Sequence, residues 1–70
     1  MAVVKVIELV GDSQQGWDDA VRQAVKEAGK TIRNISGVDV VNLTCNVGDD
    51  GEITEFKAAV QVAFQVDDNR

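Results

Sequence analysis

Residues 51–66, GEITEFKAAVQVAFQV, decide the fold, because apolar and polar side chains alternate along them. From Thr54 to Val66 one parity is almost entirely apolar, whereas the other includes Glu55, Lys57 and Gln61. Successive side chains leave a pleated strand on opposite faces, so a period of two predicts a strand. We therefore expect a long strand with one face on a core and one face carrying charges and amides.

Two further strands are predicted on the N-terminal side of this stretch. Residues 38–47, VDVVNLTCNV, read as a strand, and residues 48–51 supply the glycines and aspartates typical of a turn. Together with the long strand they predict a hairpin. Residues 3–10, VVKVIELV, are apolar on both parities, as in a strand that is buried on much of both faces.

The residues between these strands have the spacing of an amphipathic helix. Their apolar positions are three, four and seven apart, which predicts about five helical turns from Trp17 to Ile35: Trp17, Ala20, Val21, Ala24, Val25, Ala28, Ile32 and Ile35. Asp12 or Ser13 is the predicted N-terminal cap, with Gln15 placed as in a capping box. Because several of these residues are small, we expect the sheet to approach the helix closely and to curl around it. The order strand, helix, strand, strand predicts a single α+β domain over residues 1–70.

The charge balance excludes some partners. Seven basic residues against twelve acidic ones give a net charge of -5, which repels nucleic acid and anionic membrane surfaces. No apolar run approaches the roughly 20 residues that span a bilayer. The opening segment MAVVKVIELV lacks a cleavage-site pattern, so a reducing cytoplasm is the predicted location.

The small size of the chain predicts self-association. A domain of about 60 residues buries only about 60% of the surface that its unfolded chain exposes, which makes a solitary core marginal. With Cys45 as the single cysteine and no histidine, an internal disulfide and the usual zinc sites are excluded. We therefore predict a homo-oligomer. The lack of histidine also removes the commonest general base, so we predict that the protein is not an enzyme.

Three local sequences, in this order and in a chain of this length, carry a family resemblance. They are VIELVGDS leading into the helix, GVDV at residues 37–40 opening the second strand, and AAVQVAFQV closing the long strand. Together they resemble the dodecins over residues 4–66. The resemblance implies a β-α-β-β chain whose three-stranded antiparallel sheet curls around one helix. It also implies a hollow homododecamer that stores flavins, or coenzyme A in some members, without turnover.

The resemblance places the flavin site at Gly37, Val38, Asp39 and Lys57. Flavin-binding dodecins stack the flavin on a tryptophan at the position of Gly37 and bond it through a glutamine at the position of Lys57. Both residues differ in this chain, and losing an aromatic ring removes roughly 1 kcal/mol of stacking beyond its buried area. Flavin binding in the usual manner is therefore expected to be weak or absent. The arginines that hold coenzyme A in some members correspond to Thr44 and Gln65.

Calcium is a second ligand that the resemblance raises, although the residues do not fix a metal site. The chain is similar to the calcium dodecins, which lack the same tryptophan, have one at the helix start as Trp17 is here, and share a hairpin like VGDDGEIT. Calcium takes six to eight oxygen ligands. The cluster Asp49, Asp50, Glu52 and Glu55 is either such a site or a solvated turn. Symmetry could also gather one carboxylate per subunit, from Glu8, Asp39 or Glu55.

The other candidate residues each have a structural and a functional interpretation. Trp17 is either a core or subunit contact or a ligand platform, and Cys45 is predicted to be a buried, inert thiol. Lys57, Gln61 and Gln65 are either ordinary polar surface or the wall of a cavity between subunits. We predict a dodecin-like shell that sequesters a small ligand or ion. Flavin storage and a ligand-free structural shell are the alternatives.

Overall fold

The computed structural model describes residues 3–66 and contains four elements. They are the strand β1 (Val3–Ser13), the helix α1 (Trp17–Gly29) and the strands β2 (Ile35–Val47) and β3 (Ile53–Val66). The order strand, helix, strand, strand predicted from the sequence is confirmed. Among these residues no helix has the length and apolar character needed to cross a membrane.

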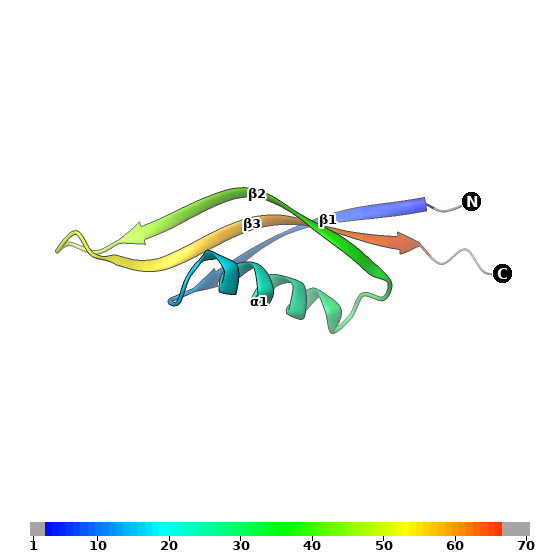
Figure 1. The fold of residues 1–70 in the computed structure, drawn as a ribbon, viewed down its shortest axis with the longest axis horizontal. Coiled ribbons are helices and arrows are strands. Elements are labelled where there is room, and N and C mark those ends of the chain that lie inside the picture. The colour runs from blue at the N-terminus through cyan, green and yellow to red at the C-terminus, as the bar shows by residue number, and fades with distance from the viewer. Residues whose placement is uncertain (1–2, 67–70) are drawn as a thin grey trace.

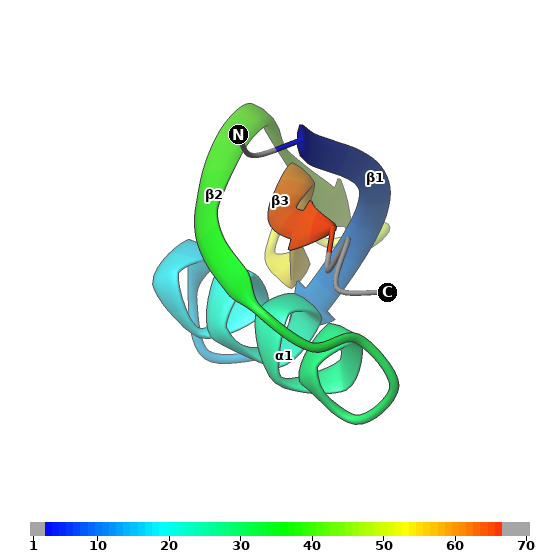
Figure 2. The same ribbon diagram turned by 90° about the vertical axis from the view of Figure 1, so that its right-hand side faces the viewer.

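The three strands form one antiparallel sheet in the order β1-β3-β2. The stretch at residues 51–66 therefore supplies the central strand, with β1 and β2 as the two edges. The sheet is long and curved, and α1 lies beneath it (Figure 1). Viewed along the long axis, β1 and β2 arch on either side of β3 above the helix (Figure 2). The predicted antiparallel sheet curled around one helix is thus confirmed.

The core lies between α1 and the middle of β3. On β3 the side chains of Ala58, Val60 and Val62 alternate with less buried neighbours, as the period of two predicts. They pack on three alanines of α1, namely Ala20, Ala24 and Ala28. These alanines are one helical turn apart, so they form one narrow buried stripe. Because the stripe consists of methyl groups, helix and sheet come close together.

The helix is shorter than the sequence predicts. The apolar spacing indicates a helix to Ile35, but α1 ends at Gly29, and Lys30, Thr31 and Ile32 donate backbone hydrogen bonds back to its last carbonyls. Glycine disfavours a helix interior by about 1 kcal/mol relative to alanine. Ile32 and Ile35 still pack against the core from the connection and from β2. The spacing therefore placed Ile32 and Ile35 against the core correctly, but it predicted the wrong backbone conformation for them.

The predicted N-terminal cap is also wrong. The residue before the helix is Gly16, and no side chain caps the first turn. β1 continues through Asp12 to Ser13, beyond its predicted end at residue 10. The Ser13 hydroxyl instead accepts a hydrogen bond from the Gln15 amide at 2.9 Å and donates one to Asp19 Oδ2 at 2.6 Å. Ser13 thus orients the connection between β1 and α1 and does not cap the start of the helix.

Candidate functional site

The candidate site residues lie mainly on the sheet face that points away from α1, which we call the outer face. Cross-strand partners share a face, and Val38 pairs with the buried Val62, so Val38 belongs to the helix side. Its neighbours Gly37 and Asp39 therefore belong to the outer face, where they pair with Ala63 and Gln61. The predicted group of residues is thus divided between the two faces of the sheet.

Lys57 also lies on the outer face but far from Gly37. It occupies the centre of a row across the sheet, with Asp12 of β1 on one side and Thr44 of β2 on the other. Gly37 pairs with Ala63, six positions further along β3, which corresponds to roughly 20 Å at 3.3 Å per residue. One chain therefore does not bring Gly37 and Lys57 to the same ligand. A site containing both would have to use more than one copy.

A second row on the outer face carries two carboxylates. Glu8 of β1 and Asp39 of β2 are both exposed and both pair with Gln61 of β3. They therefore flank the Gln61 amide from its two sides. A row containing two carboxylates and an amide offers oxygen ligands of the kind that hard cations prefer.

Two of the four hairpin carboxylates, Asp50 and Glu55, accept hydrogen bonds from within the hairpin. Asp50 Oδ1 accepts a hydrogen bond from the Glu52 amide at 3.0 Å, and Gly51 has a φ of 83°, which favours glycine. Glu55 points to the neighbouring strand, where its Oε1 accepts a hydrogen bond from Asn46 Nδ2 at 3.0 Å. Within residues 3–66 no three acidic, cysteine or histidine side chains gather into a metal-binding group. The hairpin of one chain is therefore a structured turn and no preformed calcium loop.

Trp17 lines a groove between α1 and β2. Its indole Nε1 donates to the Thr44 carbonyl at 3.0 Å, and its ring meets Phe56 edge to face with centroids 5.2 Å apart. The side chain remains 38% exposed. With Val21, Val40 and Leu43, it borders an open apolar groove of ≈ 400 Å³. Trp17 is thus both a packing residue and part of a surface groove.

Sequence reasoning missed the part that Val40 and Leu43 have in this groove. The sequence predicts only that Val40 and Leu43 lie on a strand, whereas both face the helix side and remain 44% and 45% exposed. A bulge at Val41 separates them, since Val40 pairs with Val60 and Leu43 with Ala58. The period of two is broken there, so parity counted along the sequence could not place both residues on one face.

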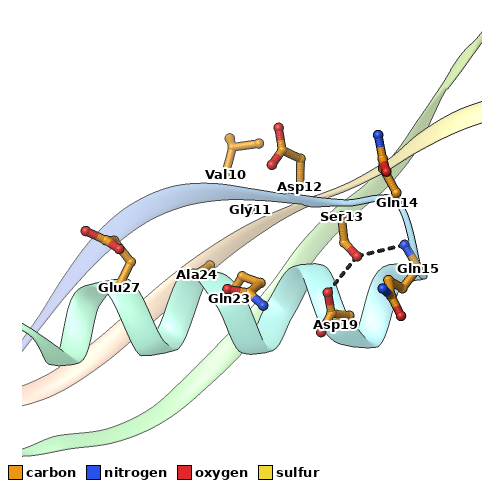
Figure 3. Close-up of a pocket in the computed structure, with 10 residues that line it drawn as sticks. All are labelled: Val10, Gly11, Asp12, Ser13, Gln14, Gln15, Asp19, Gln23, Ala24 and Glu27. Carbon is orange, nitrogen blue, oxygen red and sulfur yellow. Dashed lines mark hydrogen bonds between the residues drawn. The ribbon is translucent and has the colours of Figure 1, made fainter.

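A polar groove follows the other side of the helix, along the edge of β1 (Figure 3). It has a volume of ≈ 420 Å³ and includes the hydrogen-bonded pair Ser13 and Asp19. Figure 3 shows this pair at one end of the groove and Glu27 at the other.

Cys45 lies outside both grooves, half-buried on β2 opposite Phe56, which places it on the helix side. The sequence predicts a buried thiol, whereas the single chain leaves Cys45 half-buried.

The family resemblance can be tested against known proteins. The dodecin family model matches residues 3–67. The chain belongs to the dodecin family. A curated dodecin of Thermus thermophilus is 30% identical over 66 residues, which cover 94% of each chain. A calcium dodecin of Mycobacterium tuberculosis is likewise 30% identical, over 94% of this chain and 92% of its own.

Solved dodecin structures share the whole fold. The crystal structure of a mutant T. thermophilus dodecin superposes with a TM-score of 0.91 at 29% identity, over 99% of this chain and all of that chain. The M. tuberculosis calcium dodecin gives a TM-score of 0.81 at 26% identity, over 97% and 96% of the two chains. The long β3 and the close packing of α1 on the sheet therefore belong to a fold that this chain shares with solved dodecins.

Proposed function

We propose that this dodecin is a hollow homo-oligomer of twelve chains that binds and sequesters a small ligand or ion between its subunits. The observation that carries the proposal is the apolar surface that one chain leaves exposed. Val10 is 67% exposed and Val4 and Val6 are 54% exposed, and all three lie on the outer face of β1. Large apolar side chains that gather on one exposed face often mark a surface that binds another protein chain.

The weakness of the solitary core supports the same proposal. The buried hydrophobic residues of the described chain are four alanines and two valines, Ala20, Ala24, Ala28, Ala58, Val60 and Val62. Alanine burial contributes little free energy, because each buried CH₂ or CH₃ group adds only about 0.8 kcal/mol. The Cα atoms extend over 57 × 19 × 13 Å, a thin shape with much surface for its volume. Contacts between copies would supply the burial that the single chain lacks.

The ligand would be held on the outer face where copies meet. Gly37 leaves open space there, since a Cβ added to it would meet no atom within 4 Å in the described part of the chain. The residues that replace the aromatic platform and the amide of flavin-binding dodecins are Gly37 and Lys57, so we propose a ligand other than a stacked flavin. The row Glu8, Gln61 and Asp39 favours a cation, and the relative named calcium dodecin makes calcium the first ion to test.

Light scattering coupled to size-exclusion chromatography tests the assembly, and mass spectrometry of molecules released from freshly purified, denatured protein tests the ligand. We expect a particle about twelve times the monomer mass that carries a metal or another small molecule. A monomeric mass would refute the proposal. Recovery of flavin would establish a flavin store instead, and a particle without ligand would establish a structural shell.

Calorimetric titration with calcium distinguishes the proposed ion site from adventitious binding. The variant that combines Glu8→Gln with Asp39→Asn removes two charges and keeps the shape of both side chains. We expect it to bind calcium at least tenfold more weakly than the unmodified protein. The variant Asp49→Asn with Glu52→Gln has the same charge change at the hairpin and is expected to bind as the unmodified protein does. We propose that the protein acts in the cytoplasm by binding and not by catalysis.

A further inference from the structure

We infer that the acidic hairpin tip of one copy docks into a basic pocket at the far end of the next copy. The hairpin tip is residues 47–53, and the basic pocket lies between the start of β1, the end of β3 and the connection from α1 to β2. This inference rests on the proposed homo-oligomer and identifies one contact that would hold neighbouring copies together. The two surfaces lie at opposite ends of the folded molecule and have complementary charge (Figure 1).

The hairpin tip combines three carboxylates with two apolar side chains. Asp49, Asp50 and Glu52 are all exposed, and residues 47–53 contain no basic residue. Val47 and Ile53 pair across the strands, so they share one face, and they are 61% and 51% exposed. The tip therefore presents an apolar pair directly beside concentrated negative charge. Neither feature is covered within the described chain.

The basic pocket has the complementary composition. It is an open hollow of ≈ 330 Å³ whose charged lining residues in the described part of the chain are Lys5 and Arg33, both basic and both exposed. Its apolar lining includes Ile32, Phe64 and Val66, which are half-buried. The two ion pairs found within residues 3–66 are Asp18–Arg22 and Glu27–Lys30, and neither of them involves Lys5 or Arg33.

The two surfaces lie at opposite ends of the molecule. Figure 1 places the turn between β2 and β3 at one extreme of the long axis, and the start of β1, the end of β3 and the connection after α1 at the other. A contact between different surfaces of two copies is heterologous, and it closes into a ring when the rotation between copies allows it. Because the acidic and basic surfaces lie at opposite ends of the molecule, neighbouring copies would be arranged head to tail.

Complementary charge favours this pairing over the alternatives. Tip against tip and pocket against pocket would each bring like charges together, whereas tip against pocket brings opposite charges together. Juxtaposed like charges suppress wrong pairings, and opposite charges at the rim of an apolar contact fix its register. The apolar pair Val47 and Ile53 would then enter the hollow beside Ile32 and Phe64, with the charges around them.

Charge reversal at each end tests the inference. The pocket variant carries Lys5→Glu and Arg33→Glu. The hairpin variant carries Asp49→Lys and Glu52→Lys, and it keeps Asp50 because that side chain holds the turn. The swapped variant carries all four changes and has the same composition of charges as the unmodified chain. Dilution followed by mass photometry gives the protomer concentration at which half of each assembly has dissociated.

We expect the pocket and hairpin variants each to raise that concentration by about tenfold or more, and the swapped variant to return it to within a few-fold of the unmodified protein. The control Arg22→Glu with Lys26→Glu reverses two charges on α1 and breaks only the exposed Asp18–Arg22 pair, so it is expected to stay within a few-fold of the unmodified protein. Failure of the swapped variant to recover would overturn the inference, and so would equal dissociation of the control. Unchanged assembly in the pocket and hairpin variants would overturn it too, while leaving the proposed oligomer intact. A monomeric unmodified protein would overturn both.

Discussion

Gly11 of β1 lies directly against Ala20 of α1, because a Cβ built on Gly11 would be 2.1 Å from the Ala20 carbonyl oxygen. The same Cβ would be 3.0 Å from the Cβ of Ala24. The nearest obstacle is backbone, which cannot rotate away as the end of a side chain can. This contact sets the distance between the helix and the first strand.

Gly11→Ala is therefore expected to lower the free energy of unfolding by about 2 kcal/mol or more, since overpacking forces the helix away from the sheet. Urea unfolding at a fixed protomer concentration measures the change, because assembly makes stability depend on concentration. Gly29→Ala is the matched control, since its Cβ would meet no atom within 4 Å. A Gly11→Ala protein as stable as the control would contradict this account of the contact.

The hydrogen bond from Trp17 to Thr44 links α1 to β2, the edge strand that the helix covers least. Trp17→Phe keeps an aromatic ring beside Phe56 but removes the indole donor, so we expect a loss of about 1 kcal/mol in unfolding free energy. Trp17→Ala also removes the ring and is expected to cost about 2 kcal/mol, less than a fully buried tryptophan would. Thermal unfolding of the unmodified protein and the two variants at one protomer concentration gives their order of stability. Equal stability of Trp17→Phe and Trp17→Ala would show that the ring adds nothing.

The connection after α1 contains Asn34, whose φ of 64° is rare for residues other than glycine and asparagine. Asn34→Gly is expected to leave the free energy of unfolding nearly unchanged. Asn34→Ala is expected to lower it by about 1 kcal/mol, because the Cβ of alanine disfavours this conformation. The backbone hydrogen bond from Gln65 to Asn34 at 3.0 Å holds the residue in place. Chemical unfolding compares the two variants, and the opposite order would be evidence against a left-handed Asn34.

The open space at Gly37 predicts that flavin affinity can be introduced by one residue. Gly37→Trp would place an indole on the outer face without meeting a described atom within 4 Å of its Cβ. We expect it to bind riboflavin about tenfold or more tightly than the unmodified protein, because a stacking platform is restored. Quenching of riboflavin fluorescence measures both affinities, and Gly37→Leu controls for added apolar area. Equal binding by the leucine and tryptophan variants would rule out stacking as the cause.

The fold could be predicted from the sequence wherever one spacing of apolar residues matched both the backbone conformation and the pattern of buried side chains. The alternation along β3 predicted the buried Ala58, Val60 and Val62 correctly, because a central strand must place alternate residues against the helix. The apolar spacing of α1 predicted its buried stripe but not its end at Gly29. Ile32 and Ile35 reach the same core after the chain has left the helix, so their spacing imitated two further turns.

The candidate site was less predictable for a physical reason. Family-equivalent positions placed Gly37, Val38, Asp39 and Lys57 together, but strand alternation puts Val38 on the helix side and the register puts Lys57 about 20 Å from Gly37. Sequence patterns describe one chain, whereas a ligand held between copies depends on surfaces from several. The groove beside Trp17 escaped notice for a related reason, since the bulge at Val41 changes parity inside β2.

The alternation along β3 also has an evolutionary consequence. Ala58, Val60 and Val62 fix the fold from one side of the strand, while Lys57, Gln61 and their outer-face neighbours have no part in that packing. A mutation on the outer side can therefore alter what the proposed assembly binds without weakening the core of the subunit, and selection can act on the two properties separately. If the proposed assembly holds a ligand on this face, the ligand can change during evolution while the fold stays the same.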